Sequence, residues 1–500
     1  MNKKILGLVG GGVLVAGLAA AVVVVSNNQA ADESSSEAEM SSAATTVNQA
    51  DLILSAQDVS NVASVDVENS TGKYTIIRTA DANAETGESA VFKVKGYEEL
   101  PTNTALASTL ANNIATLTAS SIVIEDCTDM EKYGLGDDAA KGRLTFDDGS
   151  TFEFRAGKSV ADGENNYFAV EGDDTVYAVK TSLIANYSNS AESFLSLVML
   201  EAPAQDEYPI VNSLTIERED MDDRIVLTYA DYADDEDSLG GTAASHEMTE
   251  PIPAYISVER STDIITGIFG AASSKILKIY PESADLAQYG LDTPFGKAVM
   301  DCDDGNVYTL LIGDRYTEND ETTGGNTAYY PVMLDGVDAV YAMKEEKCLW
   351  ATAGPTDLAS SLVIATYVWD IEELTLSAPE LPEMKFEITG SDAESAEVKL
   401  NGETIDTERF RKFYTFLLKT TAEGVALDEE PVGEPQATLY FRTKSGSKEQ
   451  EICFYRQDAF NCLITINGES CFKCRASFID VFRKNMELFE TDEDFVMTWS

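Results

Sequence analysis

Two short acidic motifs contain the residue types that bind hard cations. Asp147-Asp148-Gly149 and Asp303-Asp304-Gly305 each place two carboxylates beside a glycine. Ca²⁺ takes about six to eight oxygen ligands, which come from a longer loop than either motif provides. Two aspartates before a glycine are typical of a tight β-hairpin turn. The pattern therefore favours two hairpin turns, with a metal site as the alternative.

The densest run of carboxylates is Asp231–Asp237, which is followed by Gly240-Gly241. Such a run could bind Ca²⁺ weakly at the millimolar concentrations found outside cells. Blocks of like charge are more commonly solvated loops, and we expect a loop here. The sequence thus predicts no metal-ligating, cofactor-binding or catalytic residue at its acidic clusters.

His246 is the only histidine among the 500 residues. Its neighbours Ser245 and Glu247 do not form a catalytic triad, because triad members come from separated segments. We expect an exposed histidine in a polar loop. Glycoside hydrolysis needs only two carboxylates about 5–10 Å apart in a cleft, and the 87 acidic residues leave that alternative open.

Cysteine is the remaining residue type whose side chain could bind a metal, form a disulfide or react. An odd number of cysteines does not complete a disulfide framework. The pair in Cys471-Phe-Lys-Cys474 has redox spacing, but it lies in a strand-like run instead of at a helix start. A zinc site that adds Cys453 and Cys462, or a Cys453–Cys462 disulfide, is an alternative to free or locally paired structural thiols. The first two cysteines fall at apolar positions and are expected to be buried. The seven are Cys127, Cys302, Cys348, Cys453, Cys462, Cys471 and Cys474.

The overall charge excludes two classes of partner. The chain has 35 Lys and Arg residues against 87 Asp and Glu residues, a formal net charge of −52. Nucleic acids and anionic lipid surfaces are bound by clustered basic residues. The sequence also lacks the glycine-rich motifs that bind nucleotide phosphates. We therefore expect no nucleic-acid partner and no cofactor.

The amino terminus has the composition of a membrane-spanning helix. The uncharged run Ile5–Val25 is about as long as the roughly 20 residues that cross a bilayer. Lys3 and Lys4 precede it, so the positive-inside rule places residues 1–4 in the cytoplasm and the rest of the chain outside. A signal peptide is the alternative, but its apolar region is usually only about 7–15 residues long.

Short motifs recur in the same order along the chain. Tyr133-Gly134-Leu135 recurs as Tyr289-Gly290-Leu291, at an offset of 289 − 133 = 156. The two Asp-Asp-Gly motifs, and Gly157 with Gly313, recur at that same offset. A more diverged third copy follows Pro431, without the Tyr-Gly-Leu motif. Ordered agreement at one offset indicates an internal repeat.

Each copy begins with strand-like segments and a helical segment. The predicted helices are 104–117, 262–269 and 407–418, and the last has one apolar face. That face consists of Phe410, Phe413, Tyr414 and Leu417. Residues with alternating polarity form strands at 74–78, 91–94, 254–260, 384–388 and 396–400. Hairpins follow each helix.

The sequence therefore predicts an α+β protein. An N-terminal transmembrane helix is followed by three tandem repeats of antiparallel β-hairpins, with one or two helices each. We expect each repeat to bury its own core and to contact its neighbours. The expected boundaries are a cytoplasmic tip at 1–4, the transmembrane helix at 5–25, a flexible spacer at 26–50, and repeat modules at 51–200, 208–365 and, in diverged form, 370–490.

This arrangement resembles a bacterial family called domain of unknown function 4340. The resemblance rests on Tyr289–Pro294 and on Leu311–Asp314 after an alternating strand and an Asp-Gly turn. The copy at 289–344 matches best, the copy at 133–180 lacks the proline, and the copy after Pro431 departs most. The resemblance implies a membrane-anchored exported protein, in some members associated with ABC-type transport systems like the gliding-motility auxiliary kind. It implies no catalytic residue.

We therefore expect a non-catalytic accessory or scaffold protein, held in the cell membrane by a single span with its C-terminal region outside the cytoplasm. Its partners would be membrane proteins, including transporter subunits if the resemblance extends to function. The alternatives are a cell-surface carbohydrate-binding protein or hydrolase that uses acidic residues, and a structural spacer that spans the cell wall.

Overall fold

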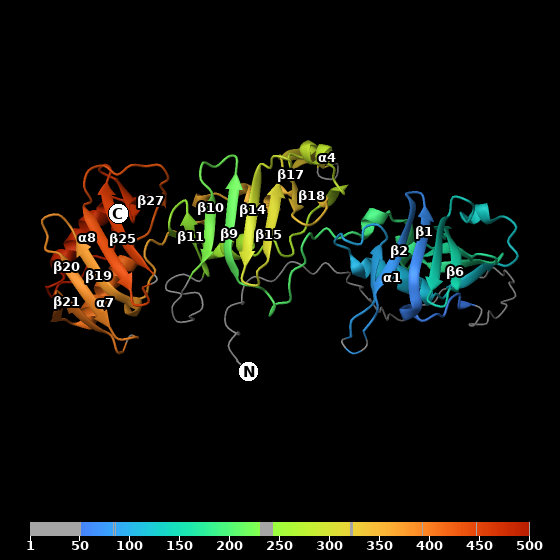
Figure 1. Cartoon of the computed structure of the whole chain (residues 1–500), viewed down its shortest axis with the longest axis horizontal. Helices are drawn as coiled ribbons and strands as arrows, with labels where there is room; N and C mark the ends of the chain where they lie inside the picture. Colours follow the sequence, from blue (N-terminus) through green and yellow to red (C-terminus); the bar gives the residue numbers. More distant parts are fainter. Residues whose placement is uncertain are drawn as a thin grey trace, which may run out of the picture. The chain divides into compact units, whose positions relative to one another are not determined.

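The computed structural model describes residues 52–83, 85, 87–230, 244–320, 324–392, 394–446 and 448–499. The predicted membrane segment 5–25, the spacer 26–50 and the acidic run Asp231–Asp237 lie outside the described residues. Within the described ranges, no helix is both long enough and apolar enough to cross a bilayer. Three antiparallel sheets with a few helices account for the described elements, so the α+β class is confirmed (Figure 1).

The first sheet is covered on one side by helix α1 (Thr104–Ala115). Asn103 caps this helix by accepting a hydrogen bond from the Leu106 amide at 3.1 Å. Small and apolar residues at helical spacing face the sheet, which lets the helix pack closely. They are Ala107, Leu110, Ala111 and Ile114. The strand order is β3 (Val91–Val94), β2 (Gly72–Ala80), β1 (Val62–Asn69), β5 (Ala140–Phe146), β6 (Thr151–Ser159), β7 (Asn165–Val170), β8 (Val176–Lys180) and β4 (Ser121–Ile124).

The second sheet packs against α3 (Val258–Ile265) and α5 (Leu349–Thr352). Buried Trp350 joins them, because its indole N–H donates to the carbonyl of Ile264 at 2.9 Å. The strand order is β12 (Ala254–Tyr255), β11 (His246–Glu250), β10 (Ile225–Tyr229), β9 (Val211–Arg218), β14 (Gly296–Cys302), β15 (Val307–Ile312), β17 (Gly325–Leu334), β18 (Ala339–Lys344) and β13 (Lys275–Ile279), with β16 (Tyr316–Asp320) paired to β17.

The predicted boundary between strand 254–260 and helix 262–269 was wrong. The strand ends at Tyr255 and the helix begins at Val258, four residues earlier than predicted. The helix ends at Ile265, and the amide of its capping residue Thr266 donates to the carbonyl of Thr262.

The third sheet is covered by α7 (Thr407–Leu418) and α8 (Ser477–Leu488). The predicted bounds of α7 and its apolar face are confirmed, since all four predicted residues are buried, together with Phe416. The strand order is β22 (Glu403–Thr404), β21 (Glu397–Leu400), β20 (Met384–Thr389), β19 (Ile371–Ser377), β24 (Ala437–Thr443), β25 (Glu449–Arg456), β26 (Asn461–Ile466), β27 (Glu469–Arg475) and β23 (Gly424–Val425).

The three sheets have the same strand topology. Each chain segment begins in the middle of its sheet, at β1, β9 or β19, and adds the next strands toward one edge. After the first helix, one strand lies at the opposite edge: β4, β13 or β23. The remaining strands then fill the gap in sequence order.

The Tyr-Gly-Leu motif ends a short helix in the first two sheets. Gly134 and Gly290 have φ values of 72° and 66°, which glycine adopts most easily. The amide of the following leucine donates to the carbonyl five residues earlier, that of Met130 at 3.0 Å and that of Leu286 at 2.8 Å. This is the hydrogen bond of a Schellman C-cap. The helices are η3 (Met130–Tyr133) and α4 (Ser283–Gln288).

The two recurring Asp-Asp-Gly motifs form hairpin turns, as predicted. Gly149 lies between β5 and β6 with a φ of 82°, and Gly305 lies between β14 and β15 with a φ of 86°. The middle aspartate accepts from the amide two residues on, at 2.8 Å for Asp148 and 2.9 Å for Asp304. The recurrence of this motif is therefore explained by turn geometry.

An extended segment before each sheet forms an isolated β-bridge with the stretch of chain between the first helix and the strand that follows it. The bridged pairs are Ile53–Thr118, Val198–Ala272 and Leu362–Thr421. The bridges Thr102–Leu195 and Ile256–Ala359 also join the two connecting segments to the part of the chain that they leave. The search for recurring sequence motifs missed this correspondence.

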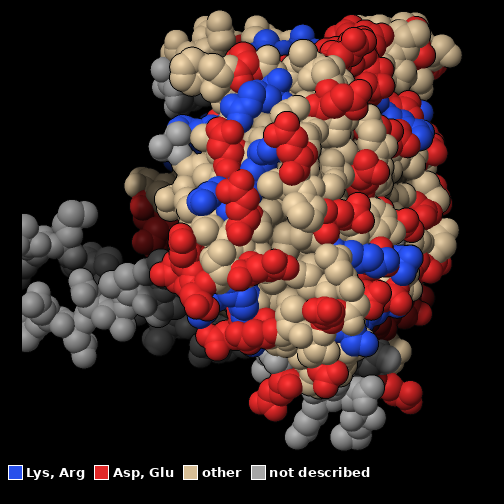
Figure 2. Space-filling model, turned by 90° about the vertical axis from the view of Figure 1, so that its left-hand side faces the viewer, with Lys and Arg blue, Asp and Glu red and all other residues tan. Residues whose placement is uncertain are grey.

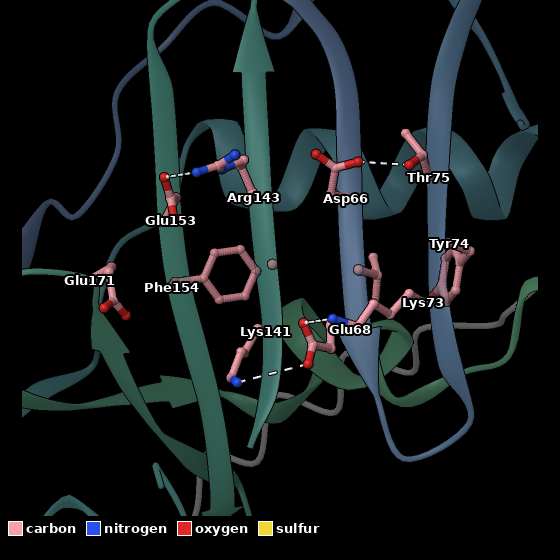
Figure 3. A pocket seen from close by; sticks show the side chains of 12 residues that line it. Asp66, Glu68, Lys73, Tyr74, Thr75, Lys141, Arg143, Glu153, Phe154 and Glu171 are labelled. Atoms are coloured by element: carbon pink, nitrogen blue, oxygen red, sulfur yellow. Dashed lines mark hydrogen bonds and ion pairs between the residues drawn. The ribbon is translucent and has the colours of Figure 1, made fainter. Parts of the chain in front are cut away.

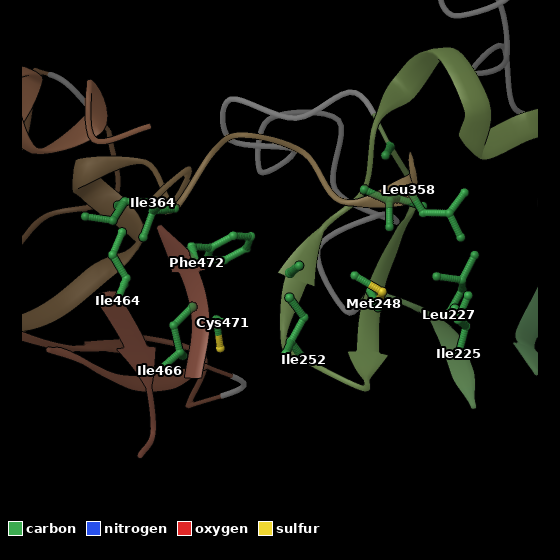
Figure 4. Close-up of a cluster of buried hydrophobic side chains, with 14 of the residues drawn as sticks. Ile225, Leu227, Met248, Ile252, Leu358, Ile364, Ile464, Ile466, Cys471 and Phe472 are labelled. Carbon is green, nitrogen blue, oxygen red and sulfur yellow. The ribbon is translucent and has the colours of Figure 1, made fainter. Parts of the chain in front are cut away.

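The buried core is not divided in three. The first sheet has its own main cluster of buried side chains, but those of the second and third sheets form one contiguous cluster. Met248 and Ile252 belong to the second sheet's share and Ile466 and Phe472 to the third's (Figure 4). The buried side chains of the second and third sheets are therefore continuous with each other.

Candidate binding site

The first sheet turns a charged surface away from α1. Alternation along β1 buries Val65 and Val67 against the helix side and points Asp66 and Glu68 outward. A hollow of about 470 Å³ lies over β1, β2, β5 and β6 (Figure 3). We call the outward side chains of this region the charged face, which consists of Asp66, Glu68, Lys73, Lys141, Arg143, Glu153, Arg155 and Glu171.

The first row of the charged face crosses four strands. The sheet register places Thr75, Asp66, Arg143 and Glu153 side by side. Thr75 donates its hydroxyl hydrogen to Asp66 Oδ1 at 2.7 Å, and Arg143 Nη2 donates to Glu153 Oε1 at 2.7 Å (Figure 3). Opposite charges directly across a strand pair stabilise the register.

The second row lies one pleat further along the same strands. Glu68 accepts a hydrogen bond from Lys73 Nζ at 2.9 Å and forms a longer ion pair with Lys141 Nζ at 3.9 Å. Arg155 donates to Glu171 through Nε at 3.0 Å and through Nη2 at 3.3 Å. The row is therefore held by one shared carboxylate and one forked arginine contact.

Apolar side chains pack on the other side of the same strands, where the sheet faces α1. Phe154 stacks on Phe168 with ring centroids 4.9 Å apart and meets Tyr187 edge-on at 4.8 Å. Gly142 makes this packing possible, because a Cβ there would lie 2.2 Å from the Phe154 ring. The strands that carry the charged face are therefore fixed from behind by the core.

The charges on this surface are well defined. The hydrogen bond from Lys73 holds the pKa of the Glu68 carboxyl below its ordinary value, and Glu153 raises the pKa of the Arg143 guanidinium by its hydrogen bond. Glu68 therefore remains a carboxylate at neutral pH and has no proton to donate as a general acid. The charged face has four acidic and four basic residues, so it is neutral within a chain of net charge −52.

Charges are interleaved elsewhere on the molecule as well. On the third sheet, Lys385 Nζ lies 3.0 Å from Glu373 Oε2, and Arg442 Nε lies 3.0 Å from Glu372 Oε2. Figure 2 shows basic side chains lying among the more numerous acidic ones over one face of the molecule. Paired charges of opposite sign therefore occur on the first and the third sheet.

His246 does not lie in an exposed loop, so that prediction was wrong. It starts β11 and its side chain is only 4% exposed. Its Nε2 lies 2.7 Å from the carbonyl of Val211 and its Nδ1 lies 2.9 Å from the Ser245 hydroxyl. Burial lowers its pKa, against the opposing effect of the Val211 hydrogen bond. The ring therefore acts as a hydrogen-bonded core residue.

All seven cysteines are buried and unbonded, which agrees with the prediction for Cys127 and Cys302. Cys471 and Cys474 lie in β27, the strand-like run that was predicted. A Cys453–Cys462 bridge does not form, because Cys453 lies opposite Thr465 and Thr438 in the neighbouring strands. No group of residues that could hold a metal is found among the described residues.

Sequence reasoning missed the charged face. Its signal was present in the alternation of Val65-Asp66-Val67-Glu68 and of Lys141-Gly142-Arg143-Leu144. Each pattern predicts a strand with one polar side. That the two polar sides are neighbours follows only from the pairing of β1 with β5, two strands separated in sequence by a helix.

Comparison with known proteins supports the family resemblance. A family model described as a domain of unknown function, DUF4340, matches residues 93–207. The chain is thus similar to this family from the end of β3 to a point beyond β8. The match includes the copy at 133–180, whereas the copy at 289–344, which was expected to match best, lies beyond it. No curated protein and no solved structure matches the chain.

Proposed function

We propose that this protein is a membrane-anchored, extracytoplasmic accessory or scaffold protein that binds other membrane proteins without catalysing a reaction. The observation that carries the proposal is the charged face of the first sheet. It offers two rows of fixed, alternating charges on a neutral surface, and complementary charges favour a specific partner over others. An open sheet face suits a protein surface better than a small substrate, which binds in an enclosing cavity.

The three sheets are proposed to be tandem repeats. Their common strand order, the C-caps shared by the first two, and the attached segment before each sheet support this reading. Repeated units that stack along a chain provide extended binding surfaces. A scaffold would use several such surfaces to hold more than one partner.

The membrane anchor is proposed from the composition of residues 5–25, and the exported location follows from the lysines that precede it. Association with an ABC-type transport system rests on the family resemblance alone. Protease treatment of intact cells tests the location. Digestion of the region after residue 50 supports export, whereas digestion only after lysis contradicts it.

The binding proposal is tested by reversing charges on the charged face. The double variant Lys141→Glu/Arg143→Glu breaks both rows, and the matched control Lys412→Glu/Lys484→Glu makes the same change in net charge on exposed positions of α7 and α8. Affinity purification from detergent-solubilised membranes should recover partners with the wild-type chain and the control but lose them with the first variant. Equal recovery with all three proteins, or no partner above background, would contradict the proposal.

A further inference from the structure

Two cysteines face each other inside the third sheet. Cys462 on β26 lies directly opposite Cys474 on β27, between the pairs Asn461–Arg475 and Leu463–Lys473. Residues directly opposite in an antiparallel pair point to the same side of the sheet. The two side chains are 1% and 4% exposed, so both thiols lie in the same part of the core.

The geometry of this strand pair suits a covalent link. Opposite residues in antiparallel strands have Cα atoms about 4.5–5.5 Å apart, within the range of about 4.4–6.8 Å found in disulfides. The Cβ atoms lie about 4.5–5.5 Å apart and must approach to about 3.5–4.5 Å. A small shift of the two strands toward each other is therefore sufficient.

The register gives neither other cysteine of β25–β27 a cysteine opposite it. Cys453 lies between two threonines, as described above. Cys471 lies at a register shift, since Phe472 pairs with Ile464 while Ser470 pairs with Thr465. Cys471 is thus left without a paired residue on β26, although it belongs to the C-x-x-C motif. Strand pairing places Cys474 opposite Cys462 instead, and the C-x-x-C spacing does not suggest this pair.

We propose that Cys462 and Cys474 form a disulfide bond when the protein is in an oxidising extracytoplasmic compartment. This proposal rests on the proposed function for the location only. Exported proteins meet conditions in which disulfides form and persist.

The oxidant is a disulfide compound, either small or carried by an exchange protein. The thiolate of one cysteine attacks a sulfur of the oxidant, forms a mixed disulfide and releases one thiol. The thiolate of the second cysteine then attacks the protein sulfur of the mixed disulfide and releases the other thiol. Two protein thiols lose two electrons and two protons, and the oxidant becomes two thiols.

The exchange takes place before the core closes. The hydrogen bond with Cys462 and burial both raise the pKa of the folded Cys474 thiol far above its ordinary value. The thiolate is the attacking species, so the folded, reduced pair reacts very slowly. Oxidation therefore accompanies folding, when β26 and β27 are still accessible.

Thiol mapping of the full chain tests the pairing in cells. Protein from cell membranes is denatured with N-ethylmaleimide present, reduced, labelled with iodoacetamide and digested. Only Cys462 and Cys474 should carry the second label. In a parallel sample, reduced protein is unfolded and refolded with glutathione disulfide, and the same pair should form.

The two samples separate the pairing from the location. If the bond forms only in the refolded sample, the protein does not meet an oxidising compartment in the cell. That result would overturn the proposal and the proposed export with it. A failure to form the bond in either sample, or a bond to Cys453 or Cys471, would overturn the pairing itself and leave the proposed function standing.

Thermal unfolding gives a second readout. The disulfide closes a short loop, which in a protein of this size should raise the unfolding temperature by about 3 °C or more. Because the folded core excludes reductant, each protein is unfolded and then refolded either with reductant or with glutathione disulfide. Refolding with reductant should lower the unfolding temperature of the wild type and of the control Cys453→Ala/Cys471→Ala, but not that of Cys462→Ala/Cys474→Ala. Because each protein is compared with itself, a general loss of stability does not obscure the result. Equal sensitivity to reductant in all three proteins would contradict the proposal.

Discussion

At the scale of single residues, Gly313 shows why some motif positions recur. A Cβ at Gly313 would lie 2.0 Å from the carbonyl oxygen of Tyr289, and one at Gly157 would lie 2.5 Å from that of Tyr133. The strand after each hairpin turn thus passes directly over the Tyr-Gly-Leu cap. The recurrence of these glycines in the sequence is therefore explained by close backbone packing.

Replacing Gly313 by alanine should therefore destabilise the protein by about 2 kcal/mol or more, because the backbone must move to admit a methyl group. The control Gly424→Ala adds the same methyl group where nothing lies within 4 Å. Urea unfolding of the two variants measures the difference. Equal stability would show that the cap and strand do not touch in solution.

His246 should make folding depend on pH. Burial lowers its pKa from the ordinary value of 6.5 in the folded protein, so the unfolded chain binds the proton more tightly. The stabilising effect of the neutral ring is present above pH 6.5 and decreases as the pH falls below that value. Because the chain has a single histidine, its ring signals in an NMR titration identify it directly. A midpoint at or above 6.5 would contradict the buried position.

At the scale of elements, a partly buried ion pair connects the second and third sheets. Lys448 Nζ lies 2.7 Å from Glu247 Oε1, 3.0 Å from the Tyr255 hydroxyl and 4.2 Å from the centre of the Tyr255 ring. Burial alone would lower the pKa of Lys448, but Tyr255 and Glu247 outweigh burial and raise it. The lysine is therefore charged within the contact between the two sheets.

Removing only Glu247 should lower the free energy of unfolding more than replacing both Glu247 and Lys448. Glu247→Gln leaves the ammonium group poorly compensated and should destabilise the protein by about 3 kcal/mol, whereas Glu247→Leu/Lys448→Met should recover much of that loss. Glu408→Gln, which breaks an exposed pair on α7, should change stability by less than about 1 kcal/mol. A double-mutant cycle from chemical denaturation measures the coupling, and independent effects would contradict it.

Several elements could be predicted because their signals are local. The helix over 407–418 has an aspartate cap and an unbroken apolar face, and its bounds are confirmed. The helix after Tyr255 was misplaced because its first turn, Val258-Glu259-Arg260, also fits an alternating strand. The buried position of His246 and the pairing of Cys462 with Cys474 depend on strand register. Strand register depends on segments that are distant in sequence, so neither feature could be predicted from local sequence patterns.

At the scale of the whole molecule, the distribution of buried side chains predicts how the chain can be divided. The first sheet has its own main core, whereas the second and third share one. A fragment of residues 52–195 should therefore fold alone, and residues 196–499 should fold together. Residues 196–368 would expose Met248 and Ile252 and should aggregate or unfold.

Circular dichroism and thermal unfolding of the three fragments check this expectation. A cooperative transition for 196–368 would show that the second sheet does not need the third. Failure of 196–499 to fold would show that the first sheet supports the others.

The attached segments before each sheet also determine how tension would travel along the chain. A force applied to the two ends acts on the sheets and the joining segments in series, and isolated bridges such as Val198–Ala272 and Leu362–Thr421 are far shorter than the ladders within the sheets. Under load these bridges should part before any sheet unravels. The molecule would lengthen as the joining segments extend and would shorten again when the force is removed.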